Sequence, residues 1–314
     1  MATTSTSPPK TPRAAGDRIF AGISLGAGIS ILVALGGVFI FLFLKGYGAL
    51  SVDESVFLGS GATDFWGYVG PLVFGTALAA VLALVIATPF AVGIALFISH
   101  YAPKRLAGPI AYVMDLLAAV PSVVFGLWGG RYLAEYLQPG IRWLADHLSF
   151  LPFFSDEGVS QSGRTMLTAG IVLAVMILPI SAAICREVFS RTPRLHEEAA
   201  LALGATRWEM IRYAVFPYSR SGVVSAVMLG LGRALGETMA VAMVLSSGFV
   251  VTLNLIGAES PRTIAANIAA NYKESGPAQQ SVLIATGLVL FAFTFAVNFL
   301  ARYIAGRSER RLAR

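Results

Sequence analysis

Long runs of apolar residues, separated by short polar segments, dominate the pattern of this chain. The first run extends from Ile19 to Leu44, and no charged residue lies between Arg18 and Lys45. A membrane-spanning helix needs about 20 mostly apolar residues, within a range of roughly 17 to 25. Six segments meet this requirement, so the pattern predicts an all-α integral membrane protein with six transmembrane helices. The predicted spans are 19–44, 69–99, 106–130, 165–185, 222–249 and 281–301.

Several prolines fall inside the predicted spans or at their ends. Proline removes a backbone N–H and clashes with the preceding turn, but a membrane helix tolerates it where neighbouring groups satisfy the freed carbonyls. We expect kinks at Pro89, in the second span, and at Pro121, in the third.

The two ends of the chain differ from the spans in composition. Residues 1–17 are rich in Ser, Thr and Pro, a composition typical of disorder. No small-residue cleavage pattern follows the first apolar run, so we interpret that run as a retained helix. Residues 307–314 are basic. The sequence therefore predicts one membrane domain, 18–306, between a disordered tail and a short basic tail.

The distribution of Lys and Arg predicts the orientation of the spans. If the amino terminus is cytoplasmic, the inner segments hold sixteen of the 23 basic residues and the outer segments hold six. Cytoplasmic loops carry an excess of basic residues, so we predict that both termini are cytoplasmic. The one remaining basic residue, Arg233, lies inside the fifth predicted span.

Composition excludes an ordinary soluble domain. Hydrophobic residues make up 56% of the chain and charged residues only 13%, about half of the roughly 25% that is usual in soluble domains. The net charge of +6 is explained by basic loops beside membrane spans, without nucleic acid. Cys185 is the single cysteine, so no internal disulfide can form.

Hydropathy falls sharply between the fourth and fifth predicted spans, over 186–220. The segment is long enough for two short helices that are broken at Gly204, which suits the end of the first helix. Pro193 suits the start of that helix. Thr206 is a candidate N-cap for the second helix, with Glu209 three residues on as its capping-box partner.

The same loop resembles the EAA loop of the permease subunits of bacterial ABC importers. The matching residues are Glu198, Ala199, Ala200, Gly204 and Pro217. The resemblance implies the type I ABC importer permease fold, in which the helix before the glycine docks on a cytoplasmic ATPase and transmits its closure to the membrane helices. Ala214 and Phe216 depart from the isoleucine and leucine of the general pattern but remain apolar. The alternative is an ordinary amphipathic connector, because Glu and Ala favour any helix.

Arg233 and Glu237 are charged residues within the fifth predicted span. An arginine at mid-helix costs about 2.5 to 3.5 kcal/mol on insertion scales, so it needs a partner or a function. Residues four positions apart lie on one helical face, and one interpretation is a structural ion pair. The other is that Arg233 faces a passage between subunits and offers planar, permanently charged donors to an oxyanion, with Glu237 holding it in place.

Asp115 is the only charged residue in the third predicted span. An isolated carboxylate at this depth is expected to face protein or water, and to be protonated or paired with a basic group across the bundle. Structural anchoring and a direct role in a substrate pathway are both open.

The chain resembles the PstC family, the permease subunits of bacterial phosphate-specific ABC importers, in the stretches DLLAAVPSVVFGLWG and LGLGRALGETMAVAM. The resemblance runs from the third predicted span through the fifth, and it associates Arg233 and Glu237 with the phosphate pathway. It implies a sister permease PstA, a pair of PstB ATPase subunits that bind ATP and Mg, and an extracytoplasmic phosphate-binding protein PstS. It also implies the bacterial plasma (inner) membrane. No cofactor is expected in this chain itself.

Three other classes of function share some of these features. An ABC permease for sulfate or molybdate would carry the same loop, and only the resemblance of the fifth span argues against it. A gradient-driven anion carrier or channel has use for the Arg and Glu pair but no need of the EAA loop. An intramembrane enzyme would need a polar cluster of nucleophile, base or metal ligands within the spans, and the sequence shows none.

Some motifs match formally but not in context. Gly22, Ser24 and Gly26 satisfy G-x-S-x-G, but a nucleophile elbow requires a strand-to-helix turn and this stretch falls inside an apolar helix. No Gly-Lys pair occurs in the sequence, so the P-loop is absent and an ATP site of that type must belong to another subunit. The three histidines lack metal-ligand spacing, so no metal is expected.

Overall fold

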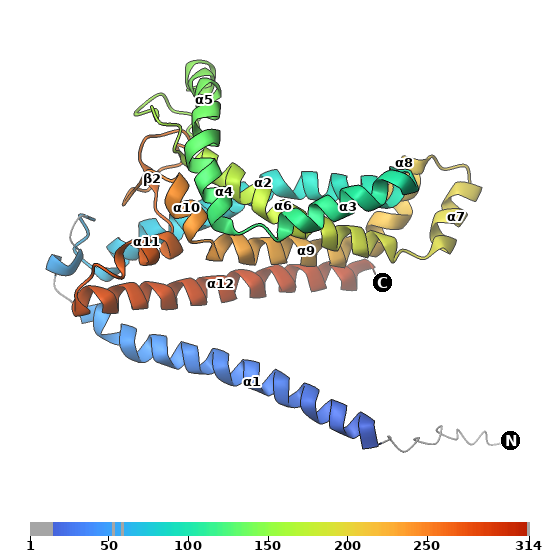
Figure 1. Ribbon diagram of the computed structural model, residues 1–314, viewed down its shortest axis with the longest axis horizontal. Helices are drawn as coiled ribbons and strands as arrows, with labels where there is room; N and C mark the ends of the chain where they lie inside the picture. The colour runs from blue at the N-terminus through green and yellow to red at the C-terminus, as the bar shows by residue number, and fades with distance from the viewer. Residues whose placement is uncertain (1–14, 52–53, 58–59, 313–314) are drawn as a thin grey trace.

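The computed structural model describes residues 15–51, 54–57 and 60–312, and long helices make up most of this part (Figure 1). By length and composition, five helical stretches within the described residues can cross a membrane, and a sixth is added if one bent pair counts as a span. The long helices are α1 (Ala15–Gly46), α2 (Phe65–Leu96), α6 (Met166–Ser190), α9 (Phe216–Gly236) and α12 (Pro277–Leu312).

Shorter elements connect these helices. The helical ones are η1 (Tyr47–Ser51), η2 (Glu54–Phe57), α3 (Lys104–Ala118), α4 (Ser122–Trp128), α5 (Ala134–Leu148), α7 (Arg194–Ala202), α8 (Arg207–Met210), α10 (Met239–Val244) and α11 (Ile264–Asn271). Three five-residue segments are π-helical: η3 (Phe97–Tyr101), η4 (Gly129–Leu133) and η5 (Ile211–Val215). Strands β1 (Ser247–Gly248) and β2 (Ser260–Pro261) form one short parallel pair, with Ser247 beside Ser260.

The centre of the bundle is built from α2, α6 and α9. A stripe of buried alanines runs along α2 at a spacing of four residues: Ala79, Ala83, Ala87, Ala91 and Ala95. This spacing places them on one helical face, and small residues allow neighbouring membrane helices to approach closely. Gly170 of α6 shows how close this approach is, because a Cβ atom there would collide with the side chain of Leu82.

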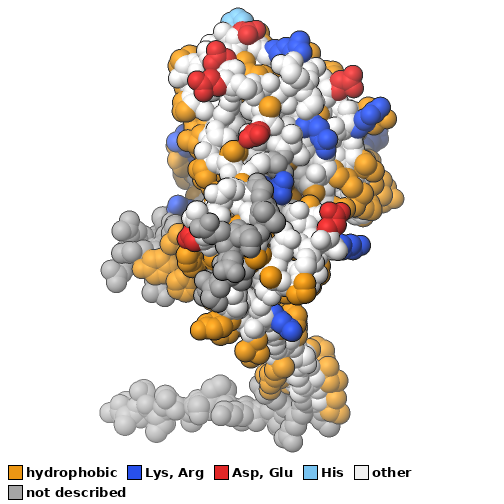
Figure 2. Space-filling view, turned by 90° about the vertical axis from the view of Figure 1, so that its left-hand side faces the viewer, with side chains coloured by type: hydrophobic (Ala, Val, Ile, Leu, Met, Phe, Trp, Pro, Cys, Tyr) orange, Lys and Arg blue, Asp and Glu red, His pale blue; other side chains and the backbone are white. Residues whose placement is uncertain are grey.

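The bundle has two distinct ends, which we call the α7 end and the α5 end. Figure 1 shows the first turns of α1, the last turns of α12, and α7 at one end, and α5, α11 and β2 at the other. Figure 2 views the molecule from the α5 end and shows acidic and basic side chains scattered over its upper part. The described part of the chain therefore begins and ends on the side of the loop between the fourth and fifth predicted spans.

Helix α1 is attached to the bundle near its carboxyl end and diverges from α12 towards its amino end (Figure 1). At the attachment point Gly46 packs on Ala285, where a Cβ atom would lie 3.0 Å from the Ala285 Cα. None of the residues in its most apolar window is buried. The helix is therefore an apolar arm whose stability depends on surroundings other than this bundle, and a bilayer provides such surroundings.

The third predicted span, 106–130, is not one straight helix. The chain bends by 90° between α3 and α4, and Pro121 lies at the bend with an extended backbone (φ −60°, ψ 141°). Proline removes one helical hydrogen bond and disfavours helical geometry in the residue before it. The kink predicted at Pro121 is thus a complete break.

The predicted tails differ from the observed helix ends. Of the disordered tail predicted over 1–17, residues 1–14 lie outside the described residues, and 15–17 already belong to α1. Of the basic tail predicted over 307–314, residues 307–312 continue α12, and 313–314 lie outside the described residues.

Candidate functional site

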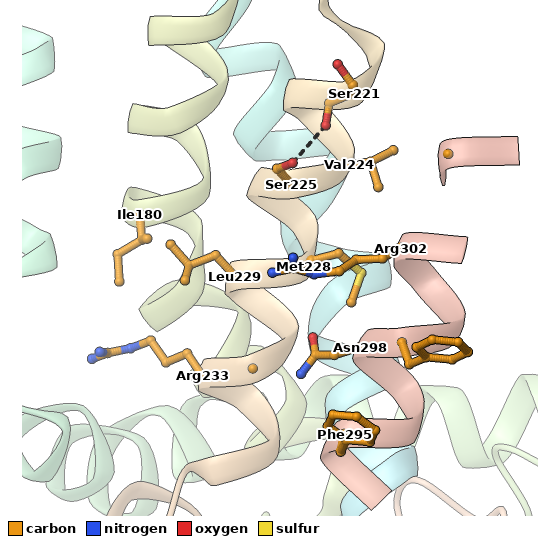
Figure 3. Close-up of a pocket in the computed structure, with 13 residues that line it drawn as sticks. Ile180, Ser221, Val224, Ser225, Met228, Leu229, Arg233, Phe295, Asn298 and Arg302 are labelled. Atoms are coloured by element: carbon orange, nitrogen blue, oxygen red, sulfur yellow. Dashed lines mark hydrogen bonds between the residues drawn. The ribbon is translucent and has the colours of Figure 1, made fainter. Parts of the chain in front are cut away.

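Arg233 lies in the last turn of α9 and lines a groove of about 1030 Å³ between α6, α9 and α12 (Figure 3). Its side chain points away from α12, on the side of α9 where Ile180 lies. The residues that line the groove are Ile180, Ser221, Val224, Ser225, Met228, Leu229, Gly232, Arg233, Phe295, Asn298, Phe299, Arg302 and Gly306.

The described side chains of this groove carry only positive charge. Among the residues whose side chains the structure describes, Arg233 and Arg302 are the charged ones that line it, and none of them is Asp or Glu. The Nε atom of Arg233 is buried and has no hydrogen-bond partner within the described part of the chain. Charged groups at membrane depth normally pair with one another or line a pathway. Among the described residues, Arg233 has no counter-charge, and only a few of the side chains around it are polar. A guanidinium offers two parallel hydrogen-bond donors to an oxyanion, so this position is suited to an oxyanion.

Glu237 does not pair with Arg233 in the way that the sequence suggests. The fifth predicted span, 222–249, contains two helices rather than one, because α9 ends at Gly236 and Glu237 has an extended backbone (φ −69°, ψ 128°). The Glu237 Oε1 atom accepts a hydrogen bond from the N–H of Ala240 at 3.1 Å. The carboxylate therefore satisfies a free N–H in the first turn of α10, and the assumption of a common helical face was wrong.

Packing against α4 explains why the helix breaks here. A Cβ atom at Gly126 of α4 would lie 2.8 Å from the Ala240 Cα, and one at Gly130 of η4 would lie 2.6 Å from the Met243 carbonyl oxygen. The missing side chains on α4 and η4 thus leave room for the backbone of α10. Gly236, a poor helix former, ends α9 where the chain turns into this contact.

Asp115 lies on α3 and not in the lining of the groove. Its Oδ2 atom is 4.0 Å from the Nη2 atom of Arg186 on α6, with 56% of the Asp115 side chain exposed and 27% of the Arg186 side chain. Of the two alternatives that the sequence left open for Asp115, a protonated carboxyl or a pair with a basic group, the structure shows the pair. Sequence reasoning did not identify Arg186 as the partner, because it was counted only as a basic residue of the loop.

The loop between α6 and α9 follows its local sequence signals closely. Pro193 is the N-cap of α7, and Gly204 beyond the end of α7 has a positive φ of 84°, which glycine adopts without steric cost. Thr206 caps α8, and the Thr206 and Glu209 side chains form the predicted capping box. The first short helix and the break at Gly204 are confirmed. The second helix begins after Thr206 as predicted, but it continues through η5 into α9 and is not a separate short helix.

Helix α7 projects from the α7 end of the bundle (Figure 1), and none of its residues is buried. Glu198 and Ala199 are exposed, while Ala200 packs against a buried cluster around Met210 and Ile211. A shallow groove of about 480 Å³ lies between α7 and the start of α9. It is lined by His196, Ala199, Ala200, Leu203, Tyr213, Ala214, Pro217 and Tyr218. Of the large apolar side chains in this lining, Leu203 is the most exposed, with 90% of its surface exposed.

Two contacts at the ends of the bundle were not found from the sequence. His100 of η3 lies beside α7, with its Nε2 atom 3.5 Å from the Glu197 Oε1 atom. At the α5 end, the Arg164 side chain donates a hydrogen bond to the carbonyl of Met243, which lies in the last turn of α10. Both link residues far apart in the chain, and neither has a local motif that reveals it. Among the described residues, no group of three or more His, Cys, Asp or Glu side chains is arranged to hold a metal ion.

Comparison with protein families finds one model over most of the bundle. Residues 87–310 match the family described as binding-protein-dependent transport system inner membrane component. The match begins within α2 and includes the loop with α7, all of α9 and nearly all of α12.

Curated relatives match over nearly the whole chain. The chain is 47% identical to the phosphate transport system permease protein PstC 2 of Mycobacterium tuberculosis over 305 residues, which cover 94% of this chain and 93% of the relative. It is 37% identical to the phosphate transport system permease protein PstC of Mesorhizobium japonicum over 306 residues, covering 94% and 91%.

A solved structure shares the fold at low sequence identity. The crystal structure of a bacterial ABC transporter involved in the import of the acidic polysaccharide alginate matches with a TM-score of 0.55 and 17% identity. The match covers 93% of this chain and 96% of that chain. It supports the helical arrangement and carries no information on substrate.

Proposed function

This chain belongs to the family of binding-protein-dependent transport system inner membrane components, and within it to the PstC permeases, and we propose that it forms half of the phosphate passage of an ATP-driven importer. It is a multi-pass membrane protein and a transport subunit rather than an enzyme. The bacterial plasma (inner) membrane, with both termini in the cytoplasm, is the location that the proposal requires.

One observation carries the choice of substrate class: within the described part of the chain, Arg233 has no counter-charge and lies in a groove that no acidic residue lines. Fixed donors in a low-dielectric groove lower the electrostatic barrier for a phosphate dianion. Glu237 supports this position indirectly, because it holds the first turn of α10 directly after the arginine. Asp115, paired with Arg186 of α6, anchors α3 in this scheme.

The projecting helix α7 provides the attachment point for an ATPase. In this proposal Glu198, Ala199 and Ala200 dock on a PstB subunit, and Gly204 lets the chain reverse into α8 and α9. The exposure of α7 and the apolar groove beside it support this assignment. Because η5 joins α8 directly to α9, a displacement of α7 reaches the helix that bears Arg233.

The remaining partners complete the importer. A sister permease PstA would form the other wall of the passage, and an extracytoplasmic binding protein PstS would deliver phosphate at the α5 end. Two PstB subunits would bind ATP and Mg. A permease for sulfate or molybdate would be expected to share these geometric features. The relatives of this chain, which are phosphate permeases, are what favour phosphate.

The test is phosphate uptake by vesicles that contain the full assembly, with sulfate and molybdate as competitors. We expect Arg233→Gln to abolish phosphate uptake while the complex still assembles and hydrolyses ATP, because the substitution removes the positive charge of Arg233 and leaves the loop that bears α7 unchanged. Arg105→Gln, which removes an exposed cation from the first turn of α3, is the matched control and is expected to transport normally.

Normal uptake by Arg233→Gln would contradict the pathway role. Competition by sulfate as strong as that by unlabelled phosphate would contradict the substrate. Uptake that continues without any co-purifying ATPase would favour a gradient-driven carrier instead.

A further inference from the structure

Helix α5 runs across the membrane helices rather than along them. The helical stretch Ser122–Leu148, which contains α4, η4 and α5, is bent by 90° from the stretch that contains α3. Helix α3 packs along α6, one of the long membrane helices. Figure 1 shows α5 at a steep angle to α9 and α12, on the same side of the bundle as α3. A helix with this direction lies in the plane of a membrane that the long helices cross.

Two opposite sides of α5 differ in exposure. Ala134, Ile141 and Ala145 are buried, and spacings of seven and four residues place them on one side of the helix. Tyr136 follows Ala134 by two residues, and Trp143 follows Ile141 by two, which is about 200° around the helix axis. Tyr136 is 82% exposed and Trp143 is 55% exposed. These two rings therefore lie almost directly opposite the buried side.

The exposed rings form a continuous row along the helix. Tyr132 in η4 lies four residues before Tyr136 and is 67% exposed, and His147 stacks on Trp143 with 4.8 Å between the ring centroids. We call Tyr132, Tyr136 and Trp143 the aromatic face of α5. Among the described residues, no hydrogen bond is made by the hydroxyl groups of the two tyrosines or by the Trp143 indole N–H. Each ring thus offers an apolar body and a free polar tip.

Charged side chains occupy one edge of α5, between the buried side and the aromatic face. Glu135, Arg142 and Asp146 are exposed and repeat at spacings of seven and four residues, so they share this edge. The Arg142 side chain donates to the Gln161 Oε1 atom at 3.3 Å, in the loop that follows α5. The helix is therefore amphipathic around its exposed surface, with charges beside aromatic rings, as in helices that lie at a membrane surface.

Protein loops cover the side of α5 that faces away from the bundle. Ile141 and Ala145 form a buried cluster with Ile256, which lies in the segment between β1 and β2. Phe154 and Val159, from the loop after α5, pack against this cluster. Figure 1 shows these loops and β2 on the side of α5 opposite to α3. The aromatic face is therefore turned back towards the flank of the bundle, where α3 lies.

The flank of the bundle on this side is apolar. Helix α3 exposes Leu106, Val113 and Leu116, which repeat at helical spacing and form one strip. In a membrane protein, lipid or another membrane helix covers such a strip. Because α3 and α5 meet at a right angle, lipid chains that lie along α3 would bring their headgroups to the aromatic face of α5.

We propose that the aromatic face of α5 binds phospholipid headgroups and anchors α5 in the membrane interface at the α5 end of the bundle. The tyrosine and tryptophan rings sit at the level of the headgroups, where these residues are enriched in membrane proteins. Their hydroxyl and indole N–H groups donate to phosphate or ester oxygens. Only the assignment to the outer leaflet rests on the proposed function, through the orientation stated there.

The position of the aromatic face argues against an aqueous binding protein as its partner. Such a protein would approach α5 from the aqueous side, which the loops around Ile256 and Val159 already cover. The aromatic face is turned the other way, towards the apolar flank. A second membrane subunit could also reach this flank, and the experiment distinguishes it from lipid.

The experiment measures what surrounds spin labels on single introduced cysteines. The full assembly is placed in vesicles of phosphatidylethanolamine and phosphatidylglycerol. Tyr136→Cys and Trp143→Cys report on the aromatic face, and Glu135→Cys and Asp146→Cys on the charged edge are the matched controls. Collisions with oxygen, which concentrates in lipid, are compared with collisions with a water-soluble nickel chelate. The assembly without an introduced cysteine is treated in parallel to correct for Cys185, which is buried.

The proposal requires a higher ratio of oxygen to nickel collisions at residues 136 and 143 than at residues 135 and 146. Frequent nickel collisions at all four positions would show that the aromatic face lies in water, and would overturn the proposal. Rare collisions with both reagents at residues 136 and 143 would show that another subunit covers this face, and would also overturn it. Both introduced positions are exposed, so if one variant does not assemble, the other makes the same test.

Failure of the proposed function gives a different result. If the wild-type assembly imports no phosphate, the proposed function fails. The collision ratios do not depend on transport, so they still decide whether α5 lies on lipid.

Discussion

The loop from Pro193 to Glu209 and the break from Arg233 to Ala240 were both interpreted from the same kind of evidence, namely residue spacing along a helix. In the loop, the spacing predicted the structure residue by residue, including a capping box. At the break, it predicted an ion pair on one helical face, and the structure shows a helix end instead. One interpretation held and the other failed.

The difference lies in where the deciding contacts come from. The loop is exposed, and its caps and its glycine act within three or four residues of themselves. The break is decided by Gly126 and Gly130, more than 100 residues earlier in the chain, against which Ala240 and Met243 pack. Local rules predict a segment well where few distant contacts compete with them.

The largest effect is expected at the contact that decides the break. Gly126→Leu would force a side chain into the backbone of Ala240, and overpacking of this kind costs about 1 to 3 kcal/mol. We expect a lower unfolding temperature of the purified protein and loss of uptake, because α10 and the end of α9 must move. Gly93→Leu, where nothing lies within 4 Å of the new Cβ, is the control. Equal stability of the two variants would show that α4 does not position α10.

A smaller effect is expected at the glycine of the loop. Gly204 has a φ of 84° and nothing within 4 Å of a Cβ atom, so the cost of Gly204→Val is conformational and about 1 to 2 kcal/mol. The orientation of α7 should change while the bundle stays intact. We expect weaker co-purification of the ATPase with an unchanged unfolding temperature. Gly204→Asn should behave nearly as wild type, because Asn tolerates this conformation; a defect as large as that of Val would mean that the side chain itself blocks docking.

The smallest effects come from removing one cap in each region. Thr206→Ala and Glu237→Ala each free one backbone N–H, at a typical cost of about 1 kcal/mol. Hydrogen exchange should accelerate locally, at Glu209 in the first variant and at Ala240 in the second. Glu237→Gln keeps an acceptor oxygen and should leave exchange at Ala240 unchanged. Faster exchange in the Gln variant would indicate that the negative charge, rather than the hydrogen bond, holds α10.

The sequence predicted some residues of the candidate site and missed others. The sequence identified Arg233 because a charge inside an apolar run is costly wherever the helix ends. Arg302 was counted only for orientation, since nothing in the sequence shows that its side chain crosses to α9. The pairing of Asp115 was expected but its partner, Arg186, was not. Which side chains share a groove depends on how α6, α9 and α12 pack, and hydropathy does not specify that packing.

The sequence by itself determined that the chain is built from membrane helices, the caps and the break of the loop, and the presence of an arginine within an apolar run. These depend on burial of apolar runs and on caps, both of which act over a few residues. The sequence also located the kink at Pro121, where the structure bends by 90°. Only the tertiary structure decided the end of α9 at Gly236 and the positive lining of the groove among the described residues. The reason is that these features depend on close approach between helices. Small residues allow that approach, but the sequence does not show which helices will meet.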